Sequence, residues 1–307
     1  MIDVVIVNWN AGERLLECVD SISPNSDGLV DRLVVVDNDS SDGSDALVEN
    51  RPGVTLVRAS QNLGFGRACN VGAARGAAGY VLFLNPDAAP LPGVLRGVKS
   101  FMDEPANKAV GICGVQLKDE DGVVARSCAR FPSAARIWAH AMGLDRFVPS
   151  LGTRMAEWNH CGAQEVDQVI GAFFFVRRDL FQQLGGFDER FFVYFEEVDF
   201  SLRARQRNWR TVYLGNLQAF HAGGGSSRHV KARRLFYSLR SRLLYSSKHF
   251  SRTGAAAALI ATLVFEPASR LALALARRSW SGVRETWGGF ALLWRWLPQW
   301  ASRGVAR

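Results

Sequence analysis

Apolar runs and helix-type segments alternate along the first 110 residues of this 307-residue chain. Four apolar runs have the length and composition of buried strands: Val4–Val7, Leu33–Val36, Val54–Val57 and Val81–Leu84. Three segments between them have the spacing and end signals of helices: Glu13–Ser21, Gly43–Glu49 and Gly66–Arg75. Apolar strands that alternate with helices indicate a doubly wound α/β sheet, which binds ligands at the carboxyl ends of its strands.

The pattern is less regular after residue 110. Asp119–Gly122 predicts a hairpin turn. Four further elements are predicted: a strand at Val169–Val176, helices at Arg178–Leu184 and Glu197–Asn208, and a strand at Thr211–Leu214. A glycine- and serine-rich stretch follows at residues 222–227. We therefore expect an α/β domain over residues 1–225 and a separate tail over residues 226–307.

Charge is distributed unevenly between these two parts. Residues 1–225 hold 22 Lys and Arg against 27 Asp and Glu, whereas residues 226–307 hold 15 against 2. Five of the nine tryptophans lie in the last 28 residues, and tryptophan with arginine is typical of a bilayer interface rather than of nucleic-acid binding. In this tail Leu235, Leu239 and Leu243 recur every four residues among basic residues, which predicts a basic amphipathic helix. We expect a basic helical extension on an anionic membrane surface; a solvated or core-packed extension is the alternative.

The sequence also bears on the compartment. The longest apolar run, Gly254–Phe265, is too short to span a bilayer, and Glu266 and Pro267 are expected to end it. The first residues lack the pattern of a signal peptide. Five cysteines without a CxxC pair argue against a disulfide framework or a zinc site. These features predict a cytoplasmic, peripheral protein.

Three polar loops follow predicted strands. In the first, Asp37 and Asp39 could accept hydrogen bonds from a base or a ribose, although helix capping explains the serines after them. The second, at residues 61–72, has glycines that allow close backbone approach and a helix start that suits phosphate; ordinary turn and cap geometry is the alternative. In the third, Asp87 follows a buried strand and is placed like a metal ligand.

The segment Gly185–Asp199 sets five carboxylates among large aromatic residues: Asp188, Glu189, Glu196, Glu197 and Asp199. Apolar neighbours make ionised carboxylates costly, so such a cluster indicates a metal, a cation or a bound proton. This is typical of an active site.

Six segments in this order resemble glycosyltransferase family 2: VIVNWN, VVDNDSSDGS, QNLGFGRACNVG, LFLNPDA, GGFDERFFVYFEEVDFSLR and FHAGGGS. The likeness runs over roughly residues 2–250 and is closer to the bacterial rhamnosyltransferase-like branch. It implies a GT-A fold (a nucleotide-diphospho-sugar transferase with a doubly wound mixed sheet), a nucleotide-sugar donor, a divalent cation (Mg²⁺ or Mn²⁺) and inversion at the anomeric carbon. It also implies a nucleotide-binding half at residues 1–110 and an acceptor and base half at residues 111–225.

The resemblance assigns donor binding to a set of polar and glycine positions: Asn8, Asp37, Asp39, Asn62, Gly64, Asn70 and Asn85. Asp87 takes the place of the family's last metal-binding aspartate. His221 matches a histidine that contacts the metal or the diphosphate in several relatives, with an uncharged structural role as the alternative. Asn85 is not an acid, which leaves fewer charges for the cation.

The general base of the family corresponds to Glu197, where aspartate is commoner. Its aromatic neighbours are expected to raise its pKa. Glu196 is expected to support the site, and Asp188 to bind the acceptor or to serve local structure. Asp199 has the same two possibilities, because it lies four residues before Arg203 on a predicted helix.

The function expected from these features is inverting, metal-dependent sugar transfer. The donor would be dTDP-rhamnose, and the acceptor a cell-surface glycan or a polyprenyl-diphosphate-linked sugar at the inner face of the cytoplasmic membrane. A sugar nucleotidyltransferase is one alternative, but the loop Asn8–Gly12 lacks the basic character that a triphosphate needs. An inactive relative that acts as a membrane scaffold is the other, and it would lack Asp87 or Glu197.

Overall fold

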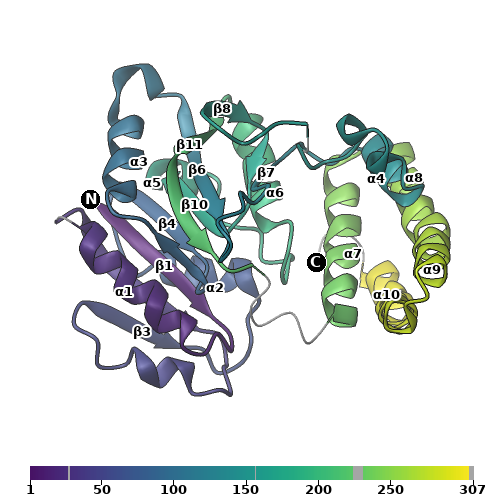
Figure 1. Cartoon of the computed structure of the whole chain (residues 1–307), viewed down its shortest axis with the longest axis horizontal. Helices are drawn as coiled ribbons and strands as arrows, with labels where there is room; N and C mark the ends of the chain where they lie inside the picture. The colour runs from purple at the N-terminus through teal and green to yellow at the C-terminus, as the bar shows by residue number, and fades with distance from the viewer. Residues whose placement is uncertain (27, 156, 224–230, 304–307) are drawn as a thin grey trace. The chain divides into compact units, whose positions relative to one another are not determined.

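A computed structural model describes residues 1–26, 28–155, 157–223 and 231–303 of the chain. The chain forms two compact units, one containing the β-sheet and the other helical (Figure 1). The sheet unit comprises residues 1–129, 158–189 and 196–226, and the helical unit residues 130–157, 190–195 and 227–307. The predicted boundary between residues 225 and 226 lies outside the described residues. The division into two halves at residue 110 stays a prediction.

The sheet unit has a mixed sheet with strand order β3-β2-β1-β4-β10-β6-β11-β5, in which β8 also pairs with β11. Its strands are β1 (Ile2–Asn8), β2 (Val30–Asp37), β3 (Val54–Arg58), β4 (Tyr80–Leu84), β5 (Ala88–Pro90), β6 (Val110–Lys118), β8 (Ala163–Val166), β10 (Phe173–Arg177) and β11 (Arg210–His221). Pairing is parallel from β3 through β4 and between β6 and β11, and β10 is antiparallel to both of its neighbours. A small second sheet pairs β7 (Cys128–Ala129) with β9 (Gln168–Val169). The four strands predicted before residue 110 are confirmed.

Helices cover both faces of the sheet. On one face α1 (Arg14–Ser26) and α3 (Val94–Asp103) pack on alternate residues of the central strands, such as Val4 and Leu82. On the other face α2 (Phe65–Ala73), α5 (Arg178–Gln183) and α6 (Glu196–Arg205) enclose a phenylalanine cluster with ring centroids 4.9–5.8 Å apart: Phe83, Phe174, Phe181, Phe187 and Phe200. The strands are apolar on both sides because both sides are covered.

Two predicted elements of the sheet unit differ in the structure. The helix expected at Gly43–Glu49 is only a short 3₁₀ turn, η1 (Ser44–Leu47), which Gly43 precedes in a left-handed conformation with φ 76°. The strand expected at Val169–Val176 is interrupted, because Gly171 and Ala172 lie between β9 and β10. A second 3₁₀ turn, η2 (Pro105–Asn107), was not predicted.

The helical unit contains α4 (Ala134–Ala141), η3 (Leu144–Arg146), η4 (Pro149–Leu151), α7 (Lys231–His249), α8 (Arg252–Ile260), a π-helical turn η5 (Ala261–Phe265), α9 (Glu266–Ala276) and α10 (Trp280–Arg303). Leu239 and Leu243 of α7 are buried against Phe290 and Leu293 of α10. The amphipathic helix predicted from the leucine spacing is therefore confirmed, and its apolar face forms the core of this unit.

Helices α8 and α9 are continuous through η5, so the prediction that Glu266 and Pro267 end the apolar helix is wrong. The widened π turn ends at Phe265, two residues before Pro267, and contains the position four residues earlier whose carbonyl group a proline ring would otherwise meet. Within the described ranges one helix, Arg252–Ala276, is long and apolar enough to cross a membrane, by length and composition only; 33 % of its apolar window is buried inside the protein.

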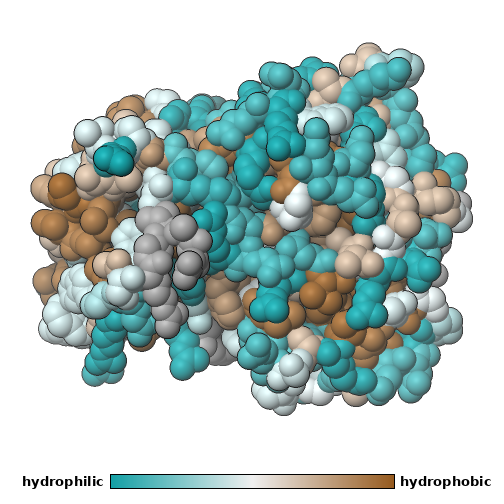
Figure 2. All heavy atoms as spheres, turned by 180° about the vertical axis from the view of Figure 1, so that it is seen from behind, coloured by the Kyte–Doolittle hydropathy of each residue, from teal (hydrophilic) through white to brown (hydrophobic). Residues whose placement is uncertain are grey.

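Exposed apolar side chains lie on this helix and on α10. Figure 2 shows apolar surface at its left edge, the side on which α8 and α9 run. Val264 is 59 % exposed, and Trp280 and Trp287 of α10 are 72 % and 58 % exposed. Trp296 and Trp300 instead pack on the apolar cluster between α7 and α10. The tryptophans of the tail therefore divide between core and surface.

Candidate active site

Asn8, the last residue of β1, connects the loops that follow β1 and β2. Its buried side-chain amide nitrogen lies 2.7 Å from Asp37 Oδ1 and 2.8 Å from Ser44 Oγ. The other carboxylate oxygen of Asp37 accepts the backbone N–H of Ser40 at 3.1 Å. Asp37 and Asn8 thus fix the loop, whereas Asp39, which is exposed and has φ 66°, carries its carboxylate at the surface. Contacts of these residues with a nucleotide stay predictions.

The loop before α2 is held by two asparagines. Asn62 Oδ1 accepts the backbone N–H of Gly64 at 2.9 Å and a hydrogen bond from Asn38 Nδ2 at 3.0 Å. Asn38, a buried residue that the sequence interpretation did not single out, also accepts the N–H of Leu63 at 2.7 Å. Gly64 has φ 82°, a conformation that favours glycine. Asn62 and Gly64 therefore shape the turn that begins α2.

Asn70 of α2 braces the acidic segment. Its Nδ2 lies 2.9 Å from the carbonyl oxygen of Phe187 and 3.1 Å from Glu189 Oε1, and its Oδ1 accepts the N–H of Phe187 at 2.9 Å. A Cβ on Gly186 would come within 2.6 Å of that Oδ1, so the segment needs glycine there. The half-buried Asp188 lies between the two residues that Asn70 holds.

The two predicted metal ligands lie together. Strand β5 pairs antiparallel with β11, so that His221 is opposite Ala88 and next to the Asp87 loop. His221 Nε2 is 3.4 Å from Asp87 Oδ1 and 3.5 Å from Asn85 Nδ2, and the Asp87 and His221 side chains are 11 % and 12 % exposed. A carboxylate oxygen and an imidazole nitrogen at this distance have the spacing of two ligands of one divalent transition-metal ion such as Mn²⁺, whereas Mg²⁺ would favour the carboxylate.

This pair needs further ligands to complete a cation site. Among the residues that the structure describes, no three His, Cys, Asp or Glu side chains are grouped to hold a metal ion. Mg²⁺ is commonly held by one or two carboxylates, water and substrate phosphate oxygens, so a two-residue site fits a cation that binds together with a diphosphate.

Glu197 lies in the first turn of α6. Burial raises the pKa of its carboxyl group, although the backbone N–H groups of Glu197, Val198 and Gly171 donate to it and act in the opposite direction. Its Oε2 is buried and has no hydrogen-bond partner in the described part of the chain. A carboxylate with a raised pKa and an oxygen left without a donor has the properties of a proton acceptor.

A single dipeptide connects the candidate metal ligands to the candidate base. The N–H of Gly171 donates to the Glu197 carboxylate, and the carbonyl oxygen of Ala172 accepts the N–H of Asn85 at 3.1 Å. Asp87 follows two residues after Asn85. The register of β10 against β4, with Phe173 opposite Leu84, explains why these segments meet. The structure thus brings the two candidate groups to the same edge of the sheet.

The other carboxylates of the cluster have different surroundings. Asp199 is fully buried, and its Oδ2 accepts from Arg203 Nε at 2.7 Å, so the ion pair foreseen from the helical spacing is present. Arg203 also donates to the carbonyl oxygens of Leu184 and Gly186, which ties α6 to the acidic segment. Glu196 is 4 % exposed and packs beside Gly66 of α2. Roles for Glu196 and Asp188 in catalysis stay predictions.

The family model described as "Glycosyl transferase family 2" matches residues 3–185. The chain belongs to glycosyltransferase family 2. This glycosyltransferase is 31 % identical over 242 residues to the N-acetylglucosaminyl-diphospho-decaprenol L-rhamnosyltransferase of Mycobacterium tuberculosis, with 72 % of this chain and 76 % of the relative covered. It is 23 % identical over 257 residues to the rhamnosyltransferase WbbL of Escherichia coli K12, with 81 % and 93 % covered.

Solved structures confirm the fold of this glycosyltransferase. The mannosyltransferase PcManGT of Pyrobaculum calidifontis, in complex with GDP-Man and Mn²⁺, has a TM-score of 0.56 and 18 % identity, with 95 % of this chain and 79 % of that chain covered. S. aureus TarS 1-349 with UDP-GlcNAc has a TM-score of 0.56 and 17 % identity, with 94 % and 80 % covered. The predicted GT-A fold with a helical C-terminal extension and the rhamnosyltransferase-like resemblance are both confirmed.

Two contributors to the glycosyltransferase site escaped the sequence interpretation. Asn38 was not singled out in the loop after the second predicted strand, and its burial and its hydrogen bonds with Asn62 and Leu63 show that it joins two loops. Gly171 acts through its backbone, and the one signal for it was a Gly-Ala pair inside an apolar run.

Replacing Asn70 with Ala is expected to lower the free energy of unfolding by about 1–3 kcal/mol, because the backbone groups of Phe187 lose their partner. Urea denaturation measures this difference. Asn50→Ala is a matched control, since Asn50 is exposed and makes no side-chain hydrogen bond in the described part of the chain. Equal, small effects of the two substitutions would show that Asn70 does not brace the segment.

Proposed function

We propose that this glycosyltransferase transfers a sugar, with inversion and with the help of a divalent cation, from a nucleotide diphosphate to a lipid-linked acceptor. One observation supports the proposal most. Gly171 donates a hydrogen bond to Glu197, and the next residue, Ala172, accepts one from Asn85, which lies two residues before Asp87 of the Asp87–His221 pair. Direct displacement needs a base near the attacking hydroxyl and a stabilising charge near the leaving diphosphate.

In the proposed reaction, Glu197 Oε2 takes the proton of the acceptor hydroxyl while the oxygen of that hydroxyl attacks the anomeric carbon of the donor sugar. The bond from that carbon to the donor phosphate oxygen breaks, and the nucleoside diphosphate leaves on the opposite face with both electrons of the bond. Asp87 and His221 would hold the cation, which supplies charge neutralisation for the leaving group. Asn8 and Asp37 hold the loop that presents Asp39 to the nucleoside.

The names of the relatives support a deoxyhexose donor. Two relatives that cover most of this chain are rhamnosyltransferases, so we propose rhamnose, from dTDP-rhamnose, as the transferred sugar. The structural neighbours were solved with GDP-Man and UDP-GlcNAc, so the fold leaves the choice of base to individual side chains. The decaprenol diphosphate in the name of the mycobacterial relative supports a polyprenyl-diphosphate-linked acceptor.

A lipid-linked acceptor requires access to a membrane. Residues 226–307 hold 15 Lys and Arg against 2 Asp and Glu, and Trp280 and Trp287 of the helical unit are exposed, which supports a place at the anionic cytoplasmic surface. Glu266 in the apolar helix is 1 % exposed and pairs with Arg242 and Arg270 of the same unit. Buried pairing within the protein supports peripheral attachment rather than a spanning helix.

Release of nucleoside diphosphate from a panel of nucleotide sugars tests the proposal. We expect release with dTDP-rhamnose and an acceptor in Mn²⁺ or Mg²⁺, loss of release in excess EDTA, and recovery when Mn²⁺ is restored. Release in EDTA at the full rate would contradict cation dependence. Turnover with another sugar would correct the donor, formation of pyrophosphate would indicate a nucleotidyltransferase, and no turnover with any donor would favour a scaffold.

A further inference from the structure

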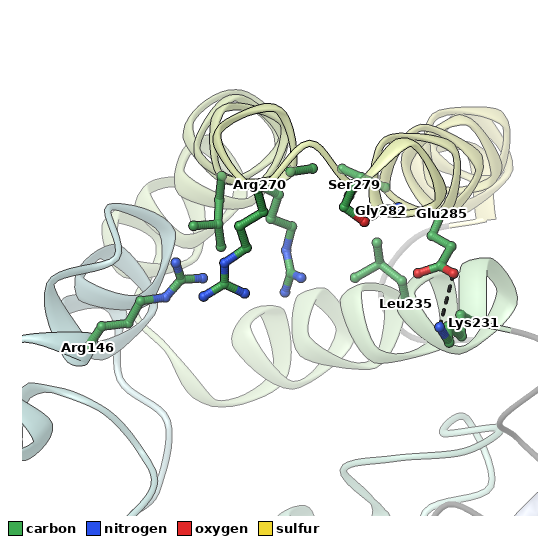
Figure 3. A pocket seen from close by; sticks show the side chains of 11 residues that line it. Arg146, Lys231, Leu235, Arg270, Ser279, Gly282 and Glu285 are labelled. Atoms are coloured by element: carbon green, nitrogen blue, oxygen red, sulfur yellow. Dashed lines mark hydrogen bonds and ion pairs between the residues drawn. The ribbon is translucent and has the colours of Figure 1, made fainter.

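The helical unit contains a cavity of about 300 Å³ bordered by η3, α7, α9 and α10. Four of its lining side chains are cationic: Arg146, Lys231, Arg270 and Arg277. Figure 3 shows Arg146 and Arg270 reaching into the space from different elements. Arginines that converge from separate segments form the kind of site that binds phosphate, because each guanidinium offers several donors in one plane.

The positive charge of this cavity is only partly compensated. Lys231 pairs with Glu285 at 3.2 Å, and Arg270 pairs with Glu266 at 2.8 Å. Arg146 and Arg277 are exposed, and within the described residues neither guanidinium makes an ion pair or a hydrogen bond. Two guanidinium groups beside one cavity therefore remain available for an anion.

The beginning of α10 adds to this charge. Ser279 and Gly282 line the cavity, and Ser279 Oγ accepts the N–H of Gly282 at 3.2 Å as a cap of the 24-residue helix. The amino-terminal end of a helix carries a partial positive charge and favours phosphate. The cap and the arginines thus favour the same ligand.

The cavity also has an apolar part, which distinguishes a lipid from a free anion. Leu235, Leu273 and Ala274 contribute to its lining. Leu275 and Trp280, the neighbours of lining residues along the chain, are 56 % and 72 % exposed. A phosphate group attached to hydrocarbon would satisfy both the guanidinium groups and these apolar side chains.

We infer that this cavity binds the phosphate group of an anionic membrane lipid. The inference goes beyond the proposed transfer reaction, since it assigns membrane attachment to one stereochemically defined site instead of to diffuse charge. The site belongs to the helical unit alone and uses none of the residues assigned to chemistry.

Flotation of the full-length protein with vesicles tests this site. The vesicles are phosphatidylcholine with or without phosphatidic acid, and no sugar donor is present, so the outcome does not depend on transfer activity. We expect wild-type protein to bind only the vesicles with phosphatidic acid. The double variant Arg146→Gln/Arg277→Gln should bind them at least about tenfold more weakly, because two charge-assisted contacts are removed.

The matched control is Arg284→Gln/Arg295→Gln, which removes two exposed charges from α10 outside the cavity. Equal losses in the two double variants would overturn the inference in favour of diffuse electrostatic attraction. Calorimetric titration with sodium pyrophosphate separates the two sources of phosphate. Binding of pyrophosphate that depends on Arg146 and Arg277, without binding to either vesicle, would identify a soluble phosphate ligand and overturn the lipid assignment.

Discussion

Replacing Glu197 with Gln is expected to lower the rate of sugar transfer by about 10²–10⁴-fold and to leave donor affinity nearly unchanged. The amide has the shape of the carboxyl group but cannot accept the acceptor's proton, and Glu197 Oε2 is a buried oxygen without a hydrogen-bond partner among the described residues. Steady-state nucleotide release measures the rate, and titration with the donor measures affinity. Glu196→Gln is the matched control and should keep most of the activity.

The pH dependence of the same two proteins gives a second readout. Burial raises the pKa of Glu197, so the ionised base forms only above the ordinary glutamate pKa of about 4.3. The transfer rate of the wild type should therefore rise as pH increases through this raised value, and the residual rate of Glu197→Gln should lack that rise. If Glu197→Gln transfers sugar at a rate within a few-fold of the wild type, and this rate still rises with pH as in the wild type, the base is another carboxylate.

The sheet was predictable because its strands are apolar on both faces, as in Val4–Val7 and Val81–Leu84, and helices cover both faces. The candidate metal pair and base were identified as residues through the resemblance to glycosyltransferase family 2, and their roles stay predictions. Their mutual position was not, because it depends on Gly171 and Ala172, whose contribution is made by backbone atoms.

The roles of the asparagines could not be read from the sequence for a related reason. Asn8 contacts Asp37 across 29 positions, and Asn70 contacts Phe187 across 117. Residue type identifies a side chain that needs partners, whereas the fold decides whether those partners are protein atoms or ligand. Both residues were expected to bind the donor, and both have partners within the protein.

The burial of apolar residues in the tail was also only partly predictable from the sequence. Leucine spacing predicted the buried face of α7, because periodicity identifies one face of one helix. It could not separate Trp296, which packs on that core, from Trp287, which is 58 % exposed. Nor did the pattern allow for a π turn that lets a helix continue past Pro267.

Replacing Asp87 with Asn is expected to lower the cation-dependent transfer rate by at least about 10²-fold, because a bound dication supplies several kcal/mol of charge stabilisation and each 1.4 kcal/mol is tenfold. Asn keeps an oxygen ligand but removes the negative charge, and His221, the other member of the pair, would have to hold the cation with that weaker ligand. Transfer rates measured over a range of Mn²⁺ concentrations should show that Asp87→Asn needs much more Mn²⁺ than the wild type.

Two comparisons separate loss of the cation from other causes. Asp31→Asn removes one exposed carboxylate of β2 outside the site and should leave the Mn²⁺ requirement unchanged. Calorimetric titration of Mn²⁺ in the presence of a nucleoside diphosphate should show weaker binding to Asp87→Asn and not to Asp31→Asn. A wild-type Mn²⁺ affinity in Asp87→Asn would place the cation elsewhere, and the link between Asp87 and Glu197 across Gly171–Ala172 would then no longer explain the chemistry.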